Sequence, residues 1–260
     1  GFPTHVKLSA KAECFLVNAA ECEPLIETDK YLCRTFPDRV VAAAVAVAGH
    51  LGAKRTVIAL KGKYHAEITA LEGAISRSGA QVELFRMKTF YPAGDEQTMV
   101  QQVTGRSVPE RGLPLDVGCV VDNVGTLLNI QDALEGTPVT EKYLSVVGEV
   151  KEPILLKVPV GTALTACVAE ARPNLADYAL IVGGPMMGKP LTDRGHQDHR
   201  KPDRPAQGAL PVPAGPAPDG DHPPSDQERL HPVPHVYRSL PPLSHRAPDP
   251  PQPGDAELLA

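Results

Sequence analysis

The chain has 260 residues, which is enough for one large domain or two small ones with a hydrophobic core. Its formal net charge of -5 gives no basic stripe and argues against nucleic acid as a partner. The most apolar run, Val40 to Ala48, is far shorter than the roughly 18 residues of a membrane-spanning helix. We therefore expect a buried helix there and no direct membrane span.

The cysteines indicate a reducing compartment. Their number is odd and none forms a C-x-x-C pair, which argues against a disulfide framework. The chain opens at Gly1 without a charged segment followed by an apolar one, so no secretory signal is visible. A cytoplasmic location is the expectation. The five residues are Cys14, Cys22, Cys33, Cys119 and Cys167.

Composition changes sharply near residue 195. Of the 28 prolines, 16 lie in residues 201–260. Proline removes backbone donors and blocks helices, so we expect a disordered, proline-rich tail over 194–260. The six histidines from His196 onward have irregular spacing, and we expect no metal site in this chain.

Strands and helices alternate before that break. Pro37 is suited to the first turn of a helix and Gly52 to its C-terminal cap. An acid-rich loop is expected after the first strand. The alternation predicts an α/β fold with parallel βαβ units, whose ligands lie at the carboxyl ends of the strands. Strands are expected at Cys14 to Ala20, Arg55 to Leu60 and Gln81 to Met87, and helices at Pro37 to Leu51 and His65 to Ser76.

A different order of elements begins near Tyr143. Two strand-like runs around a turn at Pro153 predict a hairpin, and a helix and another strand follow. This ββαβ order indicates a small β-grasp module. The runs are Tyr143 to Gly148 and Ile154 to Val158, then the helix Thr162 to Ala171 and the strand Ala179 to Val182.

Polar loops follow several of the expected strands. Gly1 and Lys7 flank a proline turn that could lie against a phosphate, although a surface turn and lysine would look the same. Asn18, Glu21 and Glu23 follow the first strand and offer acceptors for ribose hydroxyls or a ring edge. A solvated acidic loop is the alternative.

Two further loops precede expected helices. Tyr91, Gly94, Asp95 and Glu96 lie before a helix at Gln97, where acidic residues are also common as caps. The segment Asp122-Asn123-Val-Gly-Thr126 ends another strand, and its side chains could equally cap the following helix. Four polar loops at strand ends predict one shared crevice, and this convergence is more informative than any single loop.

Six segments in order resemble one family. The chain is similar to the RnfC and PduS (cobalamin reductase) electron-transport subunits, which are related to the NADH- and FMN-binding subunit of respiratory complex I. The resemblance covers residues 1 to about 193. The segments are GFPTHVKL, NAAECEP, FYPAGDEQ, PLDVGCVVDNVGTLLNI, PVTEKYLSVVGEV and GGPMMGK.

The resemblance implies an FMN- and NADH-binding α/β domain at 1–139, a β-grasp module of the soluble-ligand-binding (SLBB) type at 140–193, and the tail at 194–260. It implies electron transfer from NADH through FMN to an iron–sulfur carrier, with the flavin rather than a side chain doing the chemistry. The partners would be other subunits of an electron-transfer complex, which can be a membrane-bound one at the inner face of the cell membrane. The cofactor-binding residues carried over by motif are Gly1, Lys7, Asn18, Glu21, Glu23, Tyr91, Gly94, Asp95, Glu96, Asp122, Asn123 and Thr126.

Asp122 departs from the family pattern. The family usually has an Asn-Asn pair touching FMN where this chain has Asp122-Asn123. An ionised carboxylate there would disfavour an anionic reduced flavin.

Two expected family parts are absent from this sequence. The glycine-rich stretch that precedes GFPT in the family is missing, which implies an N-terminal truncation. The cysteines of a [4Fe-4S] cluster, expected in an intact family member, are missing after GGPMMGK. Read one base out of frame, the codons for residues 230–242 permit a C-x2-C-x2-C-x3-C-P run, which is a [4Fe-4S] ligand pattern. We therefore hypothesise a frameshift near residue 193, which reading the underlying DNA would test.

The leading functional hypothesis is an NADH-oxidising flavoprotein subunit. The alternatives are a non-catalytic ligand-binding or docking module and a non-functional truncated product. Flavin absorbance and its bleaching by NADH would separate the first from the other two.

Overall fold

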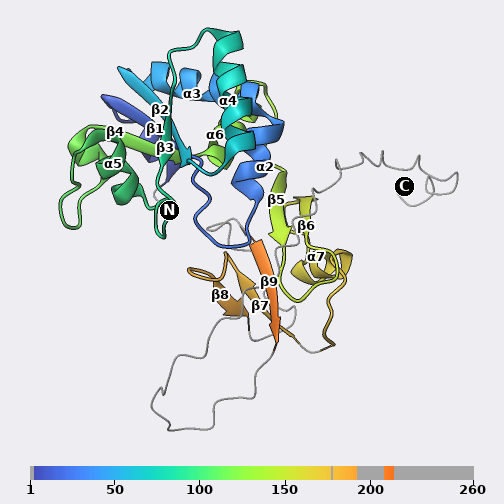
Figure 1. Ribbon diagram of the computed structural model, residues 1–260. Helices are drawn as coiled ribbons and strands as arrows, with labels where there is room; N and C mark the ends of the chain where they lie inside the picture. Colours follow the sequence, from blue (N-terminus) through green and yellow to red (C-terminus); the bar gives the residue numbers. More distant parts are fainter. Residues whose placement is uncertain (1–2, 177, 192–207, 214–260) are drawn as a thin grey trace, which may run out of the picture. The chain divides into compact units, whose positions relative to one another are not determined.

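The computed structural model describes residues 3–176, 178–191 and 208–213. The first sheet has four strands in the order β3-β2-β1-β4, and every neighbouring pair is parallel. These strands are β1 (Cys14–Asn18), β2 (Arg55–Lys61), β3 (Glu83–Met87) and β4 (Cys119–Asn123) (Figure 1). The predicted parallel α/β fold is confirmed.

Helices connect and cover these strands. Figure 1 shows α2, α3, α4 and α6 on one face of the sheet, and α5 on the other. Their bounds are α1 (Thr4–Leu8), α2 (Thr28–Thr35), α3 (Pro37–Leu51), α4 (His65–Ser78), α5 (Glu96–Thr104) and α6 (Val124–Leu134), with a 3-10 turn, η1, at Pro114–Val117.

Helix α3 illustrates how local sequence determines the element bounds. Pro37 occupies the first turn, where its missing N–H would have no helical acceptor. The helix ends at Leu51 because Gly52 adopts φ 70°, a left-handed conformation that costs a residue with Cβ more than it costs glycine. Both ends were predicted from the sequence.

The prediction of an acid-rich loop after β1 is wrong in part, because α2 occupies Thr28–Thr35. This helix has eight residues, of which only Leu32 and Cys33 are buried. Two turns give too few repeats for helical periodicity to be recognised, and isolated helices of this length are marginal. Packing against α4 and α6 therefore determines its presence.

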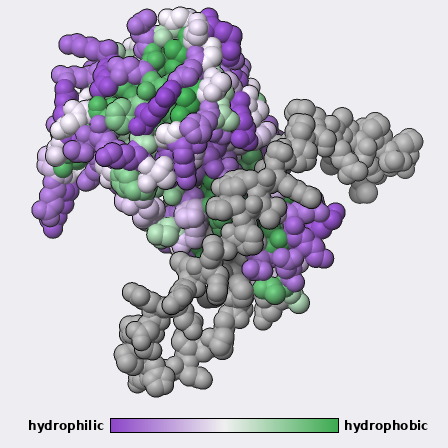
Figure 2. All heavy atoms as spheres, in the orientation of Figure 1, coloured by the Kyte–Doolittle hydropathy of each residue, from purple (hydrophilic) through white to green (hydrophobic). Residues whose placement is uncertain are grey.

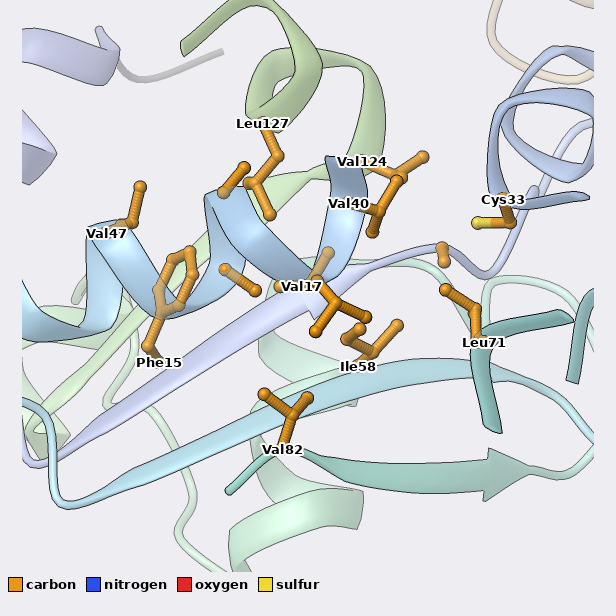
Figure 3. Packing of buried hydrophobic residues seen from close by; sticks show 14 of the residues in the cluster. Phe15, Val17, Cys33, Val40, Val47, Ile58, Leu71, Val82, Val124 and Leu127 are labelled. Atoms are coloured by element: carbon orange, nitrogen blue, oxygen red, sulfur yellow. The ribbon is translucent and has the colours of Figure 1, made fainter. Parts of the chain in front are cut away.

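Apolar side chains of alternate strand residues form two cores, one on each face of the sheet. The larger core packs Phe15 and Val17 of β1 and Ile58 of β2 beneath α3 and α6, through Val40 and Leu127 (Figure 3). The smaller core lies on the opposite face, against α5. It includes Cys14, Leu16, Val57, Ala59, Met99, Val100, Cys119 and Val121.

A second sheet has the order β6-β5-β9-β7-β8. Strands β5 (Glu141–Val146) and β6 (Ile154–Pro159) form the predicted antiparallel hairpin, followed by α7 (Leu164–Glu170) and β7 (Tyr178–Val182). The ββαβ order is thereby confirmed. The domain bounds at 139/140 and 193/194, and the SLBB type of the module, stay predictions.

Two strands of this sheet were not predicted. Strand β8 is Lys189–Leu191, and β9 (Gly208–Pro213) pairs in parallel with β5 and antiparallel with β7. The expectation that all of 194–260 is disordered is therefore corrected for 208–213. The rest of that segment, including the codons of the frameshift hypothesis, lies outside the described residues.

The described helices include none that is long and apolar enough to cross a membrane. On the face drawn in Figure 2, hydrophilic residues cover much of the described surface, with smaller hydrophobic areas between them.

Candidate functional site

The strand register brings two polar residues to one edge of the parallel sheet. Asn18 is the last residue of β1, Asn123 is the last residue of β4, and the two are directly in register. Lys61 ends the other neighbour of β1, which is β2. Because parallel strands all end on the same side, their following loops share the crevice where α/β proteins bind ligands.

Lys7 lies in a buried cluster of opposite charges. Its Nζ donates to Glu96 Oε1 at 2.8 Å and to the carbonyl of Val121 at 2.6 Å. Asp122 Oδ1 is 3.7 Å away. Lys7 comes from α1, Glu96 from the first turn of α5 and Asp122 from β4. Three of the residues predicted for one site are thus brought together.

Asp122 is the least satisfied member of this cluster. Its side chain is 3% exposed, and Oδ2 is buried without a hydrogen-bond partner among the described residues. Burial raises the pKa of Asp122 to about 6, and Lys7 opposes this increase only in part. The carboxyl group is therefore able to accept or release a proton near neutral pH.

Asn18 joins the β1 loop to the loop before α5. Its Nδ2 donates to the carbonyl of Gly94 at 2.7 Å, and its Oδ1 accepts from the backbone N–H of Ala20 at 3.1 Å. Gly94 N–H in turn donates to Cys22 Sγ at 3.3 Å. A Cβ on Gly94 would lie 3.2 Å from Cys22 Cβ, so the two loops are closely packed.

Asn123 is held from both ends of its side-chain amide. Oδ1 accepts from Gly125 N–H at 2.8 Å, which caps α6, and Nδ2 donates to Asp29 Oδ2 at 2.7 Å. Asp29 N–H donates to Glu21 Oε2 at 2.8 Å. Glu21, Asp29 and Asn123 thus connect the loop after β1, α2 and the end of β4.

Both carboxyl groups in this series of hydrogen bonds have raised pKa values. Burial raises the pKa of Asp29 to about 6. Burial, with Asp29 next in importance, raises the pKa of Glu21 well above its ordinary value. In this structure the Glu21 carboxylate is directed at the first turn of α2.

Glu23, the other acidic residue in the loop after β1, has a contact of its own. Glu23 Oε2 accepts from the backbone N–H of Met186 at 2.8 Å, and a Cβ on Gly184 would lie 2.5 Å from Glu23 Cγ. Tyr91 is 42% exposed. The Tyr91 ring therefore remains accessible to a ligand, whereas the Glu23 carboxylate has a protein partner.

Capping accounts for part of the polar pattern. Asp95 Oδ1 accepts from Thr98 N–H at 3.0 Å and so caps α5, which was one of the two interpretations of this residue. Asn123 caps α6 in the same way. Thr126 lies in the first turn of α6 and is half-buried. Gly1 lies outside the described residues.

Two side chains at this edge were missed by the sequence reasoning. Lys61 Nζ and Tyr64 Oη both donate to the carbonyl of Glu21, at 2.9 Å and 3.1 Å. Lys61 directly follows the predicted strand Arg55 to Leu60, so the strand-end rule applied to the other loops would have found it. Asp29 gave no such signal, because its helix was not predicted.

The donors and acceptors present fit a flavin ring. An isoalloxazine has an N–H donor and carbonyl acceptors along one edge, and its ribityl chain has hydroxyl donors. Asp122 Oδ2 is a buried acceptor without a donor among the described residues, and Asn123, the next residue, has an amide fixed by two hydrogen bonds. Buried polar groups normally have partners, so an orphaned one at a strand end points to a ligand.

The described residues contain no group of three or more His, Cys, Asp or Glu side chains placed to hold a metal ion.

Comparison with known proteins identifies the class. Residues 1–132 match the Nuo51 FMN-binding domain family. The match covers half of the chain and includes all the loops described above, so the chain belongs to this family.

Two individual relatives show which members of this class the chain is similar to. The chain is 43% identical over 194 residues to "Cobalamin reductase PduS" of Citrobacter freundii, covering 74% of this chain and 42% of that protein. It is 32% identical over 194 residues to a component of the Na(+)-translocating ferredoxin:NAD(+) oxidoreductase complex of Acetobacterium woodii, covering 72% and 44%. The chain thus spans less than half the length of these relatives.

A solved structure supports the fold. The crystal structure of an NAD+-reducing [NiFe]-hydrogenase in the H2-reduced state superposes with a TM-score of 0.66 at 26% identity, covering 82% of this chain and 43% of that one. The predicted resemblance to RnfC, PduS and the complex I subunit is confirmed by these findings.

Proposed function

We propose that this chain binds FMN at the carboxyl edge of its parallel sheet, and that it contributes to hydride transfer from NADH as part of an electron-transfer subunit. Bound flavin supplies the conversion between two-electron and one-electron transfer. An iron–sulfur carrier in another part of the assembly would receive the electrons. The relatives, which are a cobalamin reductase and subunits of ion-translocating complexes, support an assembly of this kind.

One observation carries the proposal. The ends of β1 and β4, the loop before α5 and helix α1 place Lys7, Asn18, Gly94, Asp122 and Asn123 around a single sheet edge. Among them is Asp122 Oδ2, which is buried and has no hydrogen-bond partner in the part of the chain that the structure describes. Such a concentration of fixed polar groups at strand ends is the arrangement that α/β folds use for nucleotide ligands.

The role of the protein side chains is to orient and to exclude water. Asn123 is fixed at both ends of its amide, so its remaining N–H keeps one direction at little entropic cost. Lys7 is neutralised by Glu96 and lies near Asp122, so the cluster has a net negative charge when both acids are ionised. A ligand that donates hydrogen bonds would be favoured there over one that only accepts.

The test is a titration of the full chain with FMN, followed by flavin fluorescence and absorbance, with and without NADH. Asn123→Ser keeps a capping oxygen for α6 but removes the Nδ2 donor. We expect this change to weaken FMN binding by about tenfold, since a lost hydrogen bond in a buried site costs about 1 to 3 kcal/mol.

Asn129→Ser, within α6 and away from the sheet edge, is the matched control and should leave the affinity for FMN unchanged. Equal affinities in the wild type and Asn123→Ser, or no FMN binding at all, would overturn the proposal for this edge. Binding of FMN without bleaching by NADH would favour the alternative of a ligand-binding module without turnover.

A further inference from the structure

A pair of thiols lies at the opposite end of the sheet from the proposed flavin site. Cys14 is the first residue of β1, Cys119 is the first residue of β4, and the two are directly in register. Both side chains belong to the core beneath α5, so they point to the same face. Cys14 is 5% exposed and Cys119 is fully buried.

The two thiols interact with each other. The Cys119 thiol donates to the carbonyl of Val117, with 3.7 Å between Sγ and O. The neighbouring Cys14 thiol lowers the pKa of Cys119 to about 7, and Arg106 adds to this effect. The same contact, with burial, raises the pKa of Cys14. The pair thus contains one thiol that ionises readily and one that does not.

Two hydrogen bonds fix the Arg106 side chain beside the turn that precedes Cys119. Its Nη1 donates to Val117 O at 2.7 Å, and its Nη2 donates to Glu13 Oε2 at 2.8 Å. A Cβ on Gly118 would lie only 3.1 Å from Arg106 Nη1. A guanidinium next to a thiol stabilises the thiolate, which is the nucleophilic form.

The strand geometry suits a covalent bond between the sulfurs. Neighbouring strands lie about 4.8 Å apart. Disulfides join residues with Cα atoms about 4.4 to 6.8 Å apart. Cys14 and Cys119 are paired across one such spacing with side chains on one face, so little backbone movement is needed.

Cys119 also borders a small cavity. The cavity has a volume of about 10 Å³, which is about the size of one water molecule. Its other lining residues include Leu113, Leu115 and Lys7. Cys119 lines this cavity and Cys14 does not, so Cys119 is the sulfur nearer to it.

We propose that Cys14 and Cys119 form a dithiol site that hydrogen peroxide oxidises to a disulfide, with Cys119 as the attacking sulfur and Cys14 as the resolving one. The Cys119 thiolate attacks one peroxide oxygen, the O–O bond breaks, and the leaving hydroxide takes up a proton to give water. Cys14 then attacks the sulfenic sulfur and displaces a second water. In total, two thiols and one peroxide give one disulfide and two waters, which balances the two electrons.

A disulfide between these two cysteines would restrain the edge strand β4. A disulfide at the start of β4 would tie that strand to β1, while Asp122 and Asn123 lie at its other end. The inference itself is independent of the proposed flavin binding, because it concerns only the two thiols and their surroundings.

The experiment treats the full, folded chain with hydrogen peroxide, blocks remaining thiols under denaturing conditions, and maps disulfides by mass spectrometry of peptides. We expect a Cys14–Cys119 linkage to be the main product. A second measurement traps sulfenic acid with dimedone. Cys14→Ser should be labelled at Cys119 at least about tenfold more than Cys119→Ser is labelled at Cys14, because the attacking thiol has the lower pKa.

The other cysteines are internal comparisons. Cys22 is the only partly exposed one in the described part of the chain, so non-specific oxidation would modify it first. Oxidation confined to Cys22, no linkage between Cys14 and Cys119, or equal dimedone labelling of the two serine variants would each overturn the proposal. Far-ultraviolet circular dichroism establishes that both variants are folded, and alanine replaces serine if either is not.

Discussion

Replacing Asp122 by Asn tests the charge balance of the proposed site. Asp122 is almost fully buried, Lys7 is its charged neighbour, and one carboxylate oxygen is unpartnered. Burial raises its pKa from the ordinary 3.8 to about 6. The folded state therefore binds a proton more tightly than the unfolded state does. The contribution of Asp122 to stability is fully present below about pH 4 and is lost as pH rises through about 6.

The size of the effect follows from the same values. The difference between 3.8 and about 6 is about two units. At about 1.4 kcal/mol for each unit, ionised Asp122 destabilises the fold by up to about 3 kcal/mol. The stability advantage of Asp122→Asn over the wild type should therefore be larger at pH 8 than at pH 4.5 by about 2 kcal/mol. Asp29 and Glu21 add their own pH dependence, which cancels in the difference between the two proteins.

The assay is urea unfolding of both proteins at the two pH values, in the absence of flavin. Asp38→Asn is the matched control, because Asp38 is exposed and its ion pair with Arg77 is on the surface. Such pairs contribute less than about 1 kcal/mol, so this variant should follow the wild type at both pH values. A stability difference for Asp122→Asn that is the same at pH 4.5 and pH 8 would refute the assignment of a buried, ionising carboxyl group.

Two further substitutions test the loops around the site. Gly94→Ala should lower the free energy of unfolding by about 1 kcal/mol, because the new Cβ would lie 3.2 Å from Cys22 Cβ, whereas Gly49→Ala, in an exposed position of α3 with no atom within 4 Å, should raise it by up to about 1 kcal/mol. Equal effects in thermal unfolding would contradict the close loop contact. Asp95→Ala should cost about 1 kcal/mol through loss of the α5 cap, and Asp95→Ser should retain most of it. Identical melting of the two Asp95 variants would show that the side-chain cap contributes little.

The strands and long helices of the α/β part could be predicted because their signals are local. Pro37 and Gly52 mark both ends of α3, and β2 contains the apolar run Val57 to Leu60. Helix α2 could not be predicted, because its eight residues become helical through contacts with α4 and α6. The strand β9 pairs with β5 and β7, which are distant in sequence, and so it has no local signal either.

The candidate site, too, could be predicted from the sequence only in part. That Asn18 and Asn123 approach one sheet edge follows from the rule that parallel strands end together, whereas Lys7 precedes β1 and its position follows from no such rule. The partners of individual side chains do not follow from any rule of spacing. The bond from Asn123 to Asp29 depends on α2, and the bond from Met186 to Glu23 joins residues far apart in the chain. The assignment of each residue to FMN or NADH stays a prediction.

The bond from Lys7 to Val121 also affects how this sheet could associate with other chains. Strand β4 is the outer strand on its side, and Gly118 O faces β1, so by alternation Val121 O faces outward. An added strand would need that carbonyl as an acceptor, yet the ammonium group of Lys7 already occupies it. A charged side chain bonded to the edge of a sheet is a known protection against strand addition. Substituting Lys7 with an apolar residue would leave the carbonyl of Val121 without this donor.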